Sequence, residues 1–392
     1  MINVTRYRVY PTKEQADIIF RQFDLCTELR NKCLDTGNFD VRQLPMFKKE
    51  QPELKEVHSV VLQNMLFQIK ENIKTLSKLK KKGFKVGRLR HKPVRNLIYE
   101  QTGFKFIGNH LSLSKIGDLR ISISRSIPGV IKQVVLKFTK THKWFVSVIS
   151  RTDDEPIPCE QVRTIGIDMN LIVFSHDSDN RTSPHPHNVR KALVQLGRAQ
   201  RKMSRKVKGS HNRKKQRLVV ARVHETVQNR RDDFLHKWST KYVFQSNYSG
   251  IAVEKLNIKD MIKKNSEMQN KKMRRAKNRN TFDAAWFKAR TFLQYKAERA
   301  GIDFRVVDPA YTSQTCSGCG HRQKMDESMR TYVCPICGMT MNRDLNAAIN
   351  IEYRAFGVGL VTPEFKLVEI DTSTQCNVTE QVLTDEARIP CL

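Results

Sequence analysis

Hydrophobic residues in the first third of the chain follow two periods. Apolar side chains recur at roughly every second position in residues 2–9, which predicts a strand that ends at Pro11. Thr12 is placed to cap a helix, and a second helical pattern covers about residues 57–82. Between residues 96 and 150, short alternating segments separated by turn residues predict a small antiparallel β-domain. We expect the opening strand to join this domain, with the helices inserted between them.

The pattern changes near residue 162. Each of three short apolar segments then ends in an acidic residue: 164–168, 250–254 and 304–308. Residues 190–231 keep helical apolar spacing, broken at 208–210, and carry fifteen basic residues against one acid, Glu225. We predict two helices here with basic outer faces, a further helix from about Thr281 and another from Asp344. Residues after 362 hold six acids and two bases with little periodicity, which predicts a loosely ordered tail.

Charge narrows the class of partner. The 392 residues include 71 Lys and Arg against 39 Asp and Glu, a formal net charge of +32. Such an excess repels itself unless a polyanion neutralises it, so nucleic acid is the first expectation and an acidic membrane surface the second. No apolar run approaches the roughly 20 residues that a membrane span needs, and no signal peptide is visible. We therefore expect a protein without a membrane partner.

Four of the nine cysteines form two CxxC knuckles separated by fourteen residues: Cys316, Cys319, Cys334 and Cys337. This spacing lets four thiolates surround one Zn²⁺ tetrahedrally, and because no coordination position stays open the zinc is predicted to be structural. The other five cysteines are scattered and odd in number, which favours a reducing compartment over a disulfide framework.

Three acids form the candidate catalytic set. Asp168 and Glu254 end strands, and Asp344 begins a helix seven residues after the last knuckle cysteine. In a mixed α/β sheet these chain ends can converge at one edge, where carboxylates hold two divalent cations about 4 Å apart for phosphodiester cleavage. Mg²⁺ favours such oxygen ligands, with Mn²⁺ able to replace it. Taken singly, Asp168 and Glu254 also fit strand-end turns and Asp344 fits an N-cap, but the three in this order favour a nuclease.

Other polar residues are open to two interpretations. Asp308, before Pro309, is a fourth candidate ligand, but a turn-forming Asp-Pro is favoured; Asp283 is best explained as a helix cap. Asn346 could orient Asp344 or could simply be a first-turn helix residue.

Several motifs together resemble one family. They are N-R at 212–213, N-R-R-D-D-F-L-H-K at 229–237, V-E-K-L-N at 253–257, Y-K-A-E at 295–298, T-S-Q-T-C at 312–316 and R-D-L-N-A-A at 343–348. In combination they are similar to the TnpB proteins, insertion-sequence nucleases that look ancestral to type V CRISPR effectors. The resemblance covers nearly the whole chain and is strongest from Val162 to about Thr362.

The resemblance implies an RNA-guided, Mg²⁺-dependent double-stranded DNA endonuclease of transposable elements. A guide RNA from the transposon end would pair with target DNA after a short flanking motif is read. A two-metal RuvC-like site would then cut and leave 5′-phosphate ends, with Asp168, Glu254 and Asp344 on the three catalytic positions. The resemblance also implies a prokaryotic, cytoplasmic and nucleoid-associated protein, and we expect a monomer with one RNA.

The implied fold is multidomain α/β: a ribonuclease H-like (RuvC) core with an inserted zinc ribbon, and an N-terminal β-barrel, the wedge, with an inserted helical recognition domain. The predicted boundaries are 1–10 and 96–160 for the wedge, 11–95 for the helical domain, 161–311 and 341–362 for the nuclease, 312–340 for the zinc ribbon and 363–392 for the tail.

Candidate nucleic-acid contacts come from the basic runs and from a segment that looks like the family's interdomain connection. They are Lys80, Lys81, Lys82, Arg88, Arg90, Gln101, Arg205, Lys206, Lys208, Arg213, Lys214, Lys215 and Arg230.

The chain also departs from the family pattern. Asn170 replaces the second glycine of G-x-D-x-G, Asn180 stands where a turn glycine is common, and the segment near Arg88 lacks its proline. Because Asn tolerates positive φ, we expect both turns to survive.

Two other functions remain open at this stage. The chain could be a guided DNA-binding repressor with an idle site. It could also act as a transposition accessory protein or strand transferase, although no Tyr or Ser motif for joining chemistry is visible.

Overall fold

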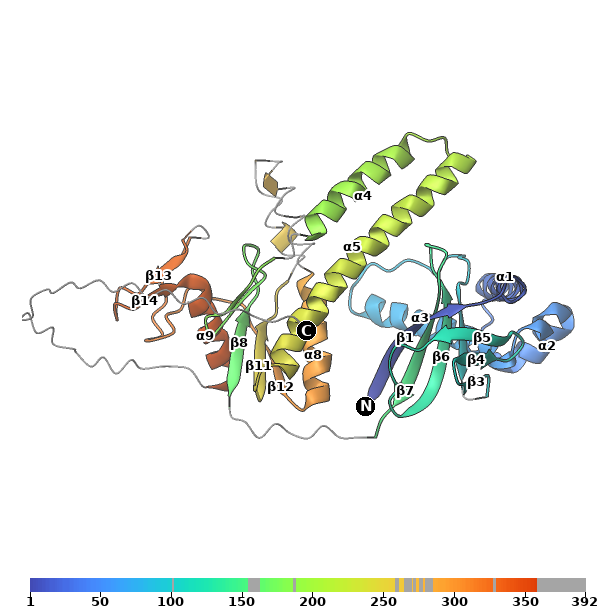
Figure 1. Ribbon diagram of the computed structural model, residues 1–392, viewed down its shortest axis with the longest axis horizontal. Coiled ribbons are helices and arrows are strands. Elements are labelled where there is room, and N and C mark those ends of the chain that lie inside the picture. The colour runs from blue at the N-terminus through green and yellow to red at the C-terminus, as the bar shows by residue number, and fades with distance from the viewer. Residues whose placement is uncertain are drawn as a thin grey trace, which may run out of the picture.

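A computed structural model describes residues 1–100, 102–153, 163–185, 188–257, 261–263, 270, 273–274, 278, 285–326 and 329–357. The N-terminal part is built on a large antiparallel sheet and the C-terminal part on a smaller mixed sheet, with the long helix α5 running between them (Figure 1). The predicted tail lies outside the described residues, as do Gln101 and Asp283.

The first sheet has seven strands in the order β2-β6-β7-β1-β5-β4-β3. They are β1 (Ile2–Tyr10), β2 (Asn96–Glu100), β3 (Phe104–Ile107), β4 (His110–Leu113), β5 (Gly117–Ser122), β6 (Val130–Phe138) and β7 (Trp144–Arg151). The opening strand β1 pairs with β7 on one side and β5 on the other, so the prediction that it joins the β-domain is confirmed. Among the described strands, β2 and β3 are left as edges, and the hydrogen bonding does not close the predicted barrel.

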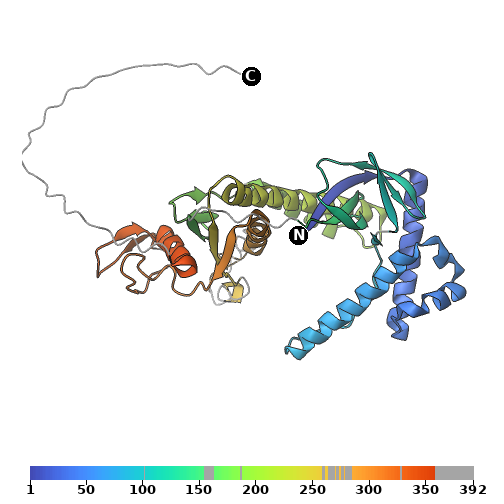
Figure 2. The ribbon, with the colours of Figure 1, turned by 90° about the horizontal axis from the view of Figure 1, so that it is seen from below.

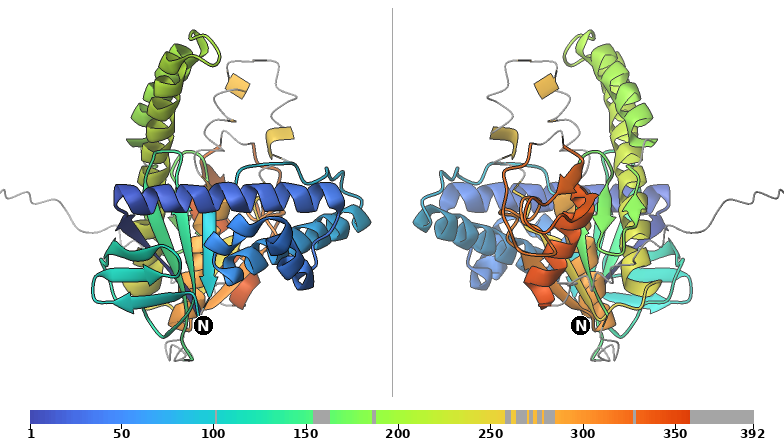
Figure 3. Two further views of the ribbon diagram at one scale, coloured as in Figure 1. Left: turned by 90° about the vertical axis from the view of Figure 1, so that its right-hand side faces the viewer. Right: turned by 90° about the vertical axis from the view of Figure 1, so that its left-hand side faces the viewer.

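Helices occupy the insertion between β1 and β2. They are α1 (Lys13–Thr36), α2 (Leu44–Glu50), α3 (Ser59–Lys81) and the short 3₁₀ turns η1 (Val41–Gln43) and η2 (Pro52–Glu56). The apolar faces of α1 and α3 share one core with the inner face of the sheet, including Phe23, Leu62, Leu97 and Val146. Figure 3 shows α1 crossing the strands of this sheet.

The helix ends follow the sequence signals. Thr12 caps α1 through its hydroxyl, which accepts from the Gln15 amide at 3.2 Å, while the Gln15 side chain accepts from the Thr12 amide at 3.0 Å. The last turns of α3 are exposed and project away from the sheet (Figure 2), and the lysines there suit the negative end of the helix dipole. α2, η1 and η2 were not expected, since their apolar runs are too short for a periodic signal.

The second sheet has five strands in the order β10-β9-β8-β11-β12. They are β8 (Thr164–Asp168), β9 (Ser175–Asp177), β10 (Thr182–Ser183), β11 (Gly250–Glu254) and β12 (Asp303–Val307). β8, β11 and β12 run parallel, while β9 is antiparallel to β8. Three predicted strand segments that end in or before an acid are thus neighbours in one sheet.

Small and large side chains alternate along the central strands. Ile165, Ile167, Ile251 and Val253 face a core with α5 (His211–Phe244) and α8 (Trp286–Ala300). On the opposite face Ala252 packs with helix α9 (Arg343–Phe356), and small residues allow that helix to approach closely. α8 begins at Trp286; the residues before 285 that were predicted to start this helix lie outside the described ranges.

The basic stretch forms a helical hairpin, α4 (Asn188–Ser204) and α5, as predicted from the break near Gly209. The hydroxyl of Ser210 caps α5 by accepting from the Arg213 amide. The remaining strands, β13 (Thr331–Val333) and β14 (Thr340–Asn342), form a two-stranded ribbon directly before α9.

Candidate active site

The three predicted acids stand at one edge of the second sheet. Asp168 ends β8 and Glu254 ends β11, and these strands are parallel neighbours paired at Ile167 and Val253. Asp344 lies in the first turn of α9, which packs on β8. All three are buried, with 9%, 5% and 9% of their surface exposed for Asp168, Glu254 and Asp344. The fold therefore brings together residues that are 176 positions apart in the sequence.

Gly166 explains how α9 comes so near to β8. A Cβ atom at this position would lie 2.1 Å from the carbonyl oxygen of Ala348 and 2.6 Å from the amide nitrogen of Glu352, both in the α9 backbone. A hydrogen bond of 2.6 Å from the Thr164 hydroxyl to Glu352 holds the same contact. Only glycine permits this approach, which sets the position of Asp344 relative to Asp168.

Asn342, and not Asp344, caps α9. Its Oδ1 accepts from the amides of Asp344 at 2.8 Å and Leu345 at 3.3 Å. The Asp344 side chain is thereby released from the capping role that the sequence left open.

The environment of the acids favours a bound cation. Burial, and then the nearby charges of Glu254 and Asp344, raises the pKa of Asp168 well above its ordinary value. Burial raises the pKa of Glu254 to about 7, and a hydrogen bond from the Thr312 hydroxyl opposes that rise. Buried carboxylates that repel one another are stabilised by a shared cation, and carboxylate oxygens are ligands that Mg²⁺ accepts.

The carboxylates are more widely spread than a preformed cage. Among the described residues, the four knuckle cysteines are the one group of three or more potential ligand side chains whose ligand atoms all lie within 4.8 Å of one another. Asn170 stands between two of the acids: its Nδ2 is 3.4 Å from Asp168 Oδ2 and 3.1 Å from Asp344 Oδ2. Asn170 does not adopt positive φ, contrary to our expectation, whereas Asn180 does at φ 61°.

Contacts bear on the other two open assignments. Asp308 Oδ1 accepts from the Ala310 amide at 2.9 Å, as the favoured turn predicts, and the Asp308 charge also acts on Glu254. Asn346 neither orients Asp344 nor simply fills a helix turn. It is fully buried, accepts from the Ser317 amide at 2.9 Å and donates to the Thr315 carbonyl at 2.7 Å.

The four cysteines converge as predicted. Cys316 Sγ lies 3.6 Å from Cys337 Sγ, and Cys319 Sγ lies 3.5 Å from Cys334 Sγ. Thiolates at about 2.3 Å from a tetrahedral zinc lie about 3.8 Å apart, so this donor set fits Zn²⁺. The cluster suggests a structural zinc site.

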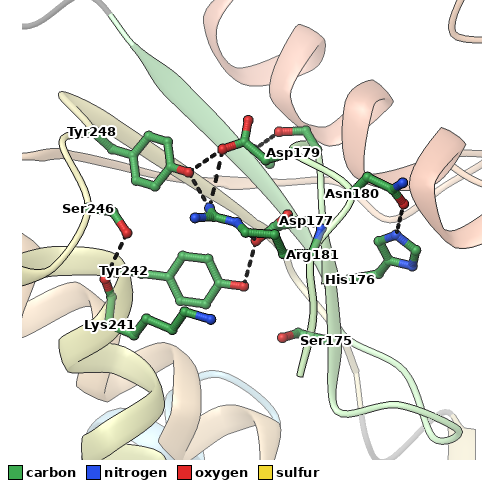
Figure 4. Close-up of polar contacts among 12 residues, drawn as sticks. Ser175, His176, Asp177, Asp179, Asn180, Arg181, Lys241, Tyr242, Ser246 and Tyr248 are labelled. Atoms are coloured by element: carbon green, nitrogen blue, oxygen red, sulfur yellow. Dashed lines mark hydrogen bonds and ion pairs between the residues drawn. The ribbon is translucent and has the colours of Figure 1, made fainter. Parts of the chain in front are cut away.

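A second polar network, which we did not predict, fixes β9 to the end of α5 (Figure 4). Asp177 is fully buried and accepts from the Arg181 amide at 2.8 Å, from Arg181 Nε at 3.1 Å and from the Tyr242 hydroxyl at 3.0 Å. Asp179 accepts from the hydroxyl of Tyr248 and pairs with Arg181. Because β9 pairs with the end of β8, this network supports the strand that carries Asp168.

The predicted basic contacts have different surroundings. Lys80, Lys81, Lys82, Arg88, Arg90, Arg205, Lys208, Lys214, Lys215 and Arg230 are exposed, and Lys206 is half-buried. Arg213 is half-buried and also holds the hairpin turn, because its Nη1 donates to the carbonyls of Met203 at 2.9 Å and Lys206 at 2.7 Å. Gln101 lies outside the described residues.

A basic cleft lies between the first sheet and α5. Its volume is about 470 Å³, and its described lining contains no acid: Arg95, Lys140, His142, Lys214, Lys215, Arg217, Leu218 and Ala221. Glu225, further along α5, accepts from Lys143 at 2.9 Å and Thr141 at 3.3 Å. The single acid of the basic stretch thus joins α5 to the β6–β7 turn.

In the described part of the chain, no helix combines the length and apolar character of a membrane span.

The fold is multidomain α/β and resembles the folds of compact Cas12 effectors. A solved structure titled as a Cas12f1–sgRNA–target DNA complex has a TM-score of 0.57 at 13% identity, over 90% of this chain and 98% of that one. Residues 147–265 match a family model described as "Probable transposase", and residues 286–351 one described as "Cas12f1-like, TNB domain".

Curated relatives make the family more specific. A protein of Streptomyces pristinaespiralis named "Putative RNA-guided DNA endonuclease" is 32% identical over 88% of this chain and 87% of its own length. Escherichia coli (strain K12) has a relative of the same description, InsQ, 32% identical over 62% of this chain and 61% of its own length. The chain belongs to the TnpB family of RNA-guided DNA endonucleases.

Proposed function

We propose that this chain is an RNA-guided, Mg²⁺-dependent endonuclease of a transposable element, which cuts double-stranded DNA at a two-metal RuvC-like site. The observation that carries the proposal is the meeting of Asp168, Glu254 and Asp344 as buried, mutually repelling carboxylates in a chain of this family. The strand order, with β8 central, β9 antiparallel and β11 parallel to it, supports a ribonuclease H-like core.

Each acid has a role in the proposed reaction. Asp168, Glu254 and Asp344 would together hold the two cations, since all three are buried carboxylates at the same edge of the sheet. Two Mg²⁺ ions, when bound there, supply positive charge that activates the attacking water and stabilises the departing oxygen. Water attacks the phosphorus, the bond to the 3′ oxygen breaks, and a 5′-phosphate and a 3′-hydroxyl result. Thr312 keeps the Glu254 carboxylate oriented through its hydroxyl.

The nucleic-acid partners follow from charge and family. A guide RNA from the transposon end and a target DNA with a short flanking motif would neutralise the net charge of +32. The basic cleft beside α5 and the exposed lysines of α3 are surfaces for their phosphates. On this proposal the first sheet is the wedge, residues 11–95 the recognition domain, 161–311 and 341–362 the nuclease, and 312–340 the zinc ribbon; one chain acts with one RNA.

The proposal is tested by purifying the chain with its element, sequencing the RNA that copurifies, and reprogramming that RNA toward a plasmid with the flanking motif. Cleavage with Mg²⁺ is expected for the wild type, with no cleavage by Asp168→Ala or Glu254→Ala at unchanged RNA content. Asp303→Asn is the matched control, because this exposed acid of the same sheet pairs with Arg305 only at the surface.

Two results would contradict the proposal. An intact plasmid alongside tight guided binding would identify a repressor, and joined DNA strands in place of 5′-phosphate ends would identify a strand transferase. Wild-type cleavage by Asp168→Ala would overturn the metal assignment alone.

A further inference from the structure

Asn170 occupies the position between two of the proposed metal ligands. Its amide nitrogen lies 3.4 Å from Asp168 Oδ2 and 3.1 Å from Asp344 Oδ2, in a place where the family motif has glycine and no side chain. We propose that the Asn170 amide acts as a resident donor that competes with the divalent cation for these two oxygens, and so lowers the metal affinity of the site. The inference rests on the proposed function, since it concerns the same carboxylates.

The direction of the amide is fixed by its other end. Asn170 Oδ1 accepts from the backbone amides of Ile172 at 3.0 Å and Val173 at 3.1 Å. Turning the amide over would lose both of these bonds and would set its oxygen against two carboxylate oxygens. The NH₂ group therefore faces the acids, and the turn after β8 holds it there.

Competition follows from the space between the acids. A Mg²⁺ ion needs contacts of about 2.1 Å to its oxygens, so an ion that bridged the two Oδ2 atoms would meet the amide hydrogens. Binding then requires Asn170 to rotate away and give up its 3.1 Å hydrogen bond to Asp344 and its longer 3.4 Å contact with Asp168. Arg343 and Arg330 also face Asp344, at 3.4 Å and 3.9 Å, and the positive charge of Arg343 also acts on Asp168.

Asn170 therefore sets the metal affinity of the site, whereas the sequence had indicated only a substitution that the turn tolerates. A member with glycine at this position lacks the resident donor, so its carboxylates depend on the cation alone. The chain with Asn170 keeps one amide donor against Asp168 and Asp344 when no metal is bound, and should need more Mg²⁺ to load.

The test is a titration of the full protein–RNA complex with Mn²⁺, in which electron paramagnetic resonance measures the concentration of free Mn²⁺. Asn170→Ser is the main variant, because the serine hydroxyl still accepts from the Ile172 and Val173 amides but cannot reach both acids. Asn170→Gly, the family residue, is the second. The complex with Asp168→Ala supplies the background of Mn²⁺ bound to RNA.

We expect both Asn170 variants to bind Mn²⁺ about tenfold more tightly at the Asp168-dependent site, in line with the loss of one charge-assisted hydrogen bond. The Mg²⁺ concentration for half-maximal cleavage should fall in parallel. Equal or weaker Mn²⁺ binding by both variants overturns the competition while leaving the proposed function intact. Identical titrations for wild type and Asp168→Ala overturn both, because no metal then binds at these acids.

Discussion

Replacing Gly166 with alanine tests how strongly the site depends on one backbone contact. The added Cβ would sit 2.1 Å from the Ala348 carbonyl oxygen and 2.6 Å from the Glu352 amide, whereas ordinary contacts begin at 3.4 Å. Both opposing atoms are backbone, so no rotamer change can relieve the clash. Helix α9 must retreat from β8 by about 1 Å, since packed cores have no spare volume.

The Gly166→Ala substitution should lower the free energy of unfolding and should also displace Asp344. Overpacking a core typically costs about 1–3 kcal/mol, and a backbone-to-backbone clash belongs at the upper end, about 3 kcal/mol. The retreat also carries Asp344 away from Asp168, because both sit on the elements that separate. A misplacement of about 1 Å in a catalytic group costs about 100-fold in rate. We therefore expect Gly166→Ala to fold but to cut at about one hundredth of the wild-type rate.

The assay is single-turnover cleavage of a guided plasmid, with urea unfolding of the same preparations. Gly197→Ala is the matched control: this glycine lies inside α4 with no heavy atom within 4 Å of the added Cβ. That variant should cut normally and gain up to about 1 kcal/mol from helix propensity. A Gly166→Ala protein that cuts within about twofold of the wild type would refute the claim that this contact positions Asp344.

Three further changes probe other contacts. Lys296→Met should lower the free energy of unfolding by about 2 kcal/mol in a urea titration, because the Lys296 ammonium donates at 2.8 Å to the His236 carbonyl and to two hydroxyls in α5. The control is Lys237→Met, which removes an exposed ion pair. It should change the free energy of unfolding by less than about 0.5 kcal/mol. Glu225→Gln should lower the unfolding temperature in about 0.05 M salt but not in about 0.5 M salt, because salt screens the partly exposed ion pair between Glu225 and Lys143. An equal decrease at both salt concentrations would contradict an electrostatic link. Zinc chelation should speed hydrogen exchange in β13, β14 and the first turn of α9 but not in the first sheet, and uniform protection throughout would argue against a structural metal.

Local signals in the sequence predicted most of the elements. The Thr12 capping box marks the start of α1, and the break near Gly209 separates α4 from α5 because both signals are read within a few residues. The CxxC spacing predicted the cysteine cluster for the same reason: each pair of thiols is held by a short knuckle. Short turns such as α2 and η2 were missed, since they depend on the core formed with α1 and α3.

Contacts between distant segments set the rest. The role of Gly166 exists only because α9, almost two hundred residues later, packs on β8. Asn170 was interpreted as a residue that tolerates positive φ, yet its contact with Asp344 is what distinguishes it. Arg213 was grouped with the nucleic-acid contacts by charge, and the structure adds a role that charge does not reveal, since its Nη1 donates to two carbonyls of the hairpin turn. In each case the role of the residue depends on a tertiary contact, which the sequence alone does not show.

Helix α9 links the cysteine cluster to the proposed catalytic acids. Its first turn carries Asp344, its small residues lie on β8, and its buried Asn346 and Asn350 bind the backbone at Thr315, where the first knuckle begins. Thr312, three residues before that carbonyl, donates to Glu254. The cysteine-containing segment is thus hydrogen-bonded to Glu254 through Thr312, and to the helix that carries Asp344 through Asn346 and Asn350. These contacts hold the start of α9 and the Thr312 hydroxyl at the sheet edge, which gives a physical reason for a cysteine cluster directly before an acid proposed for the chemistry.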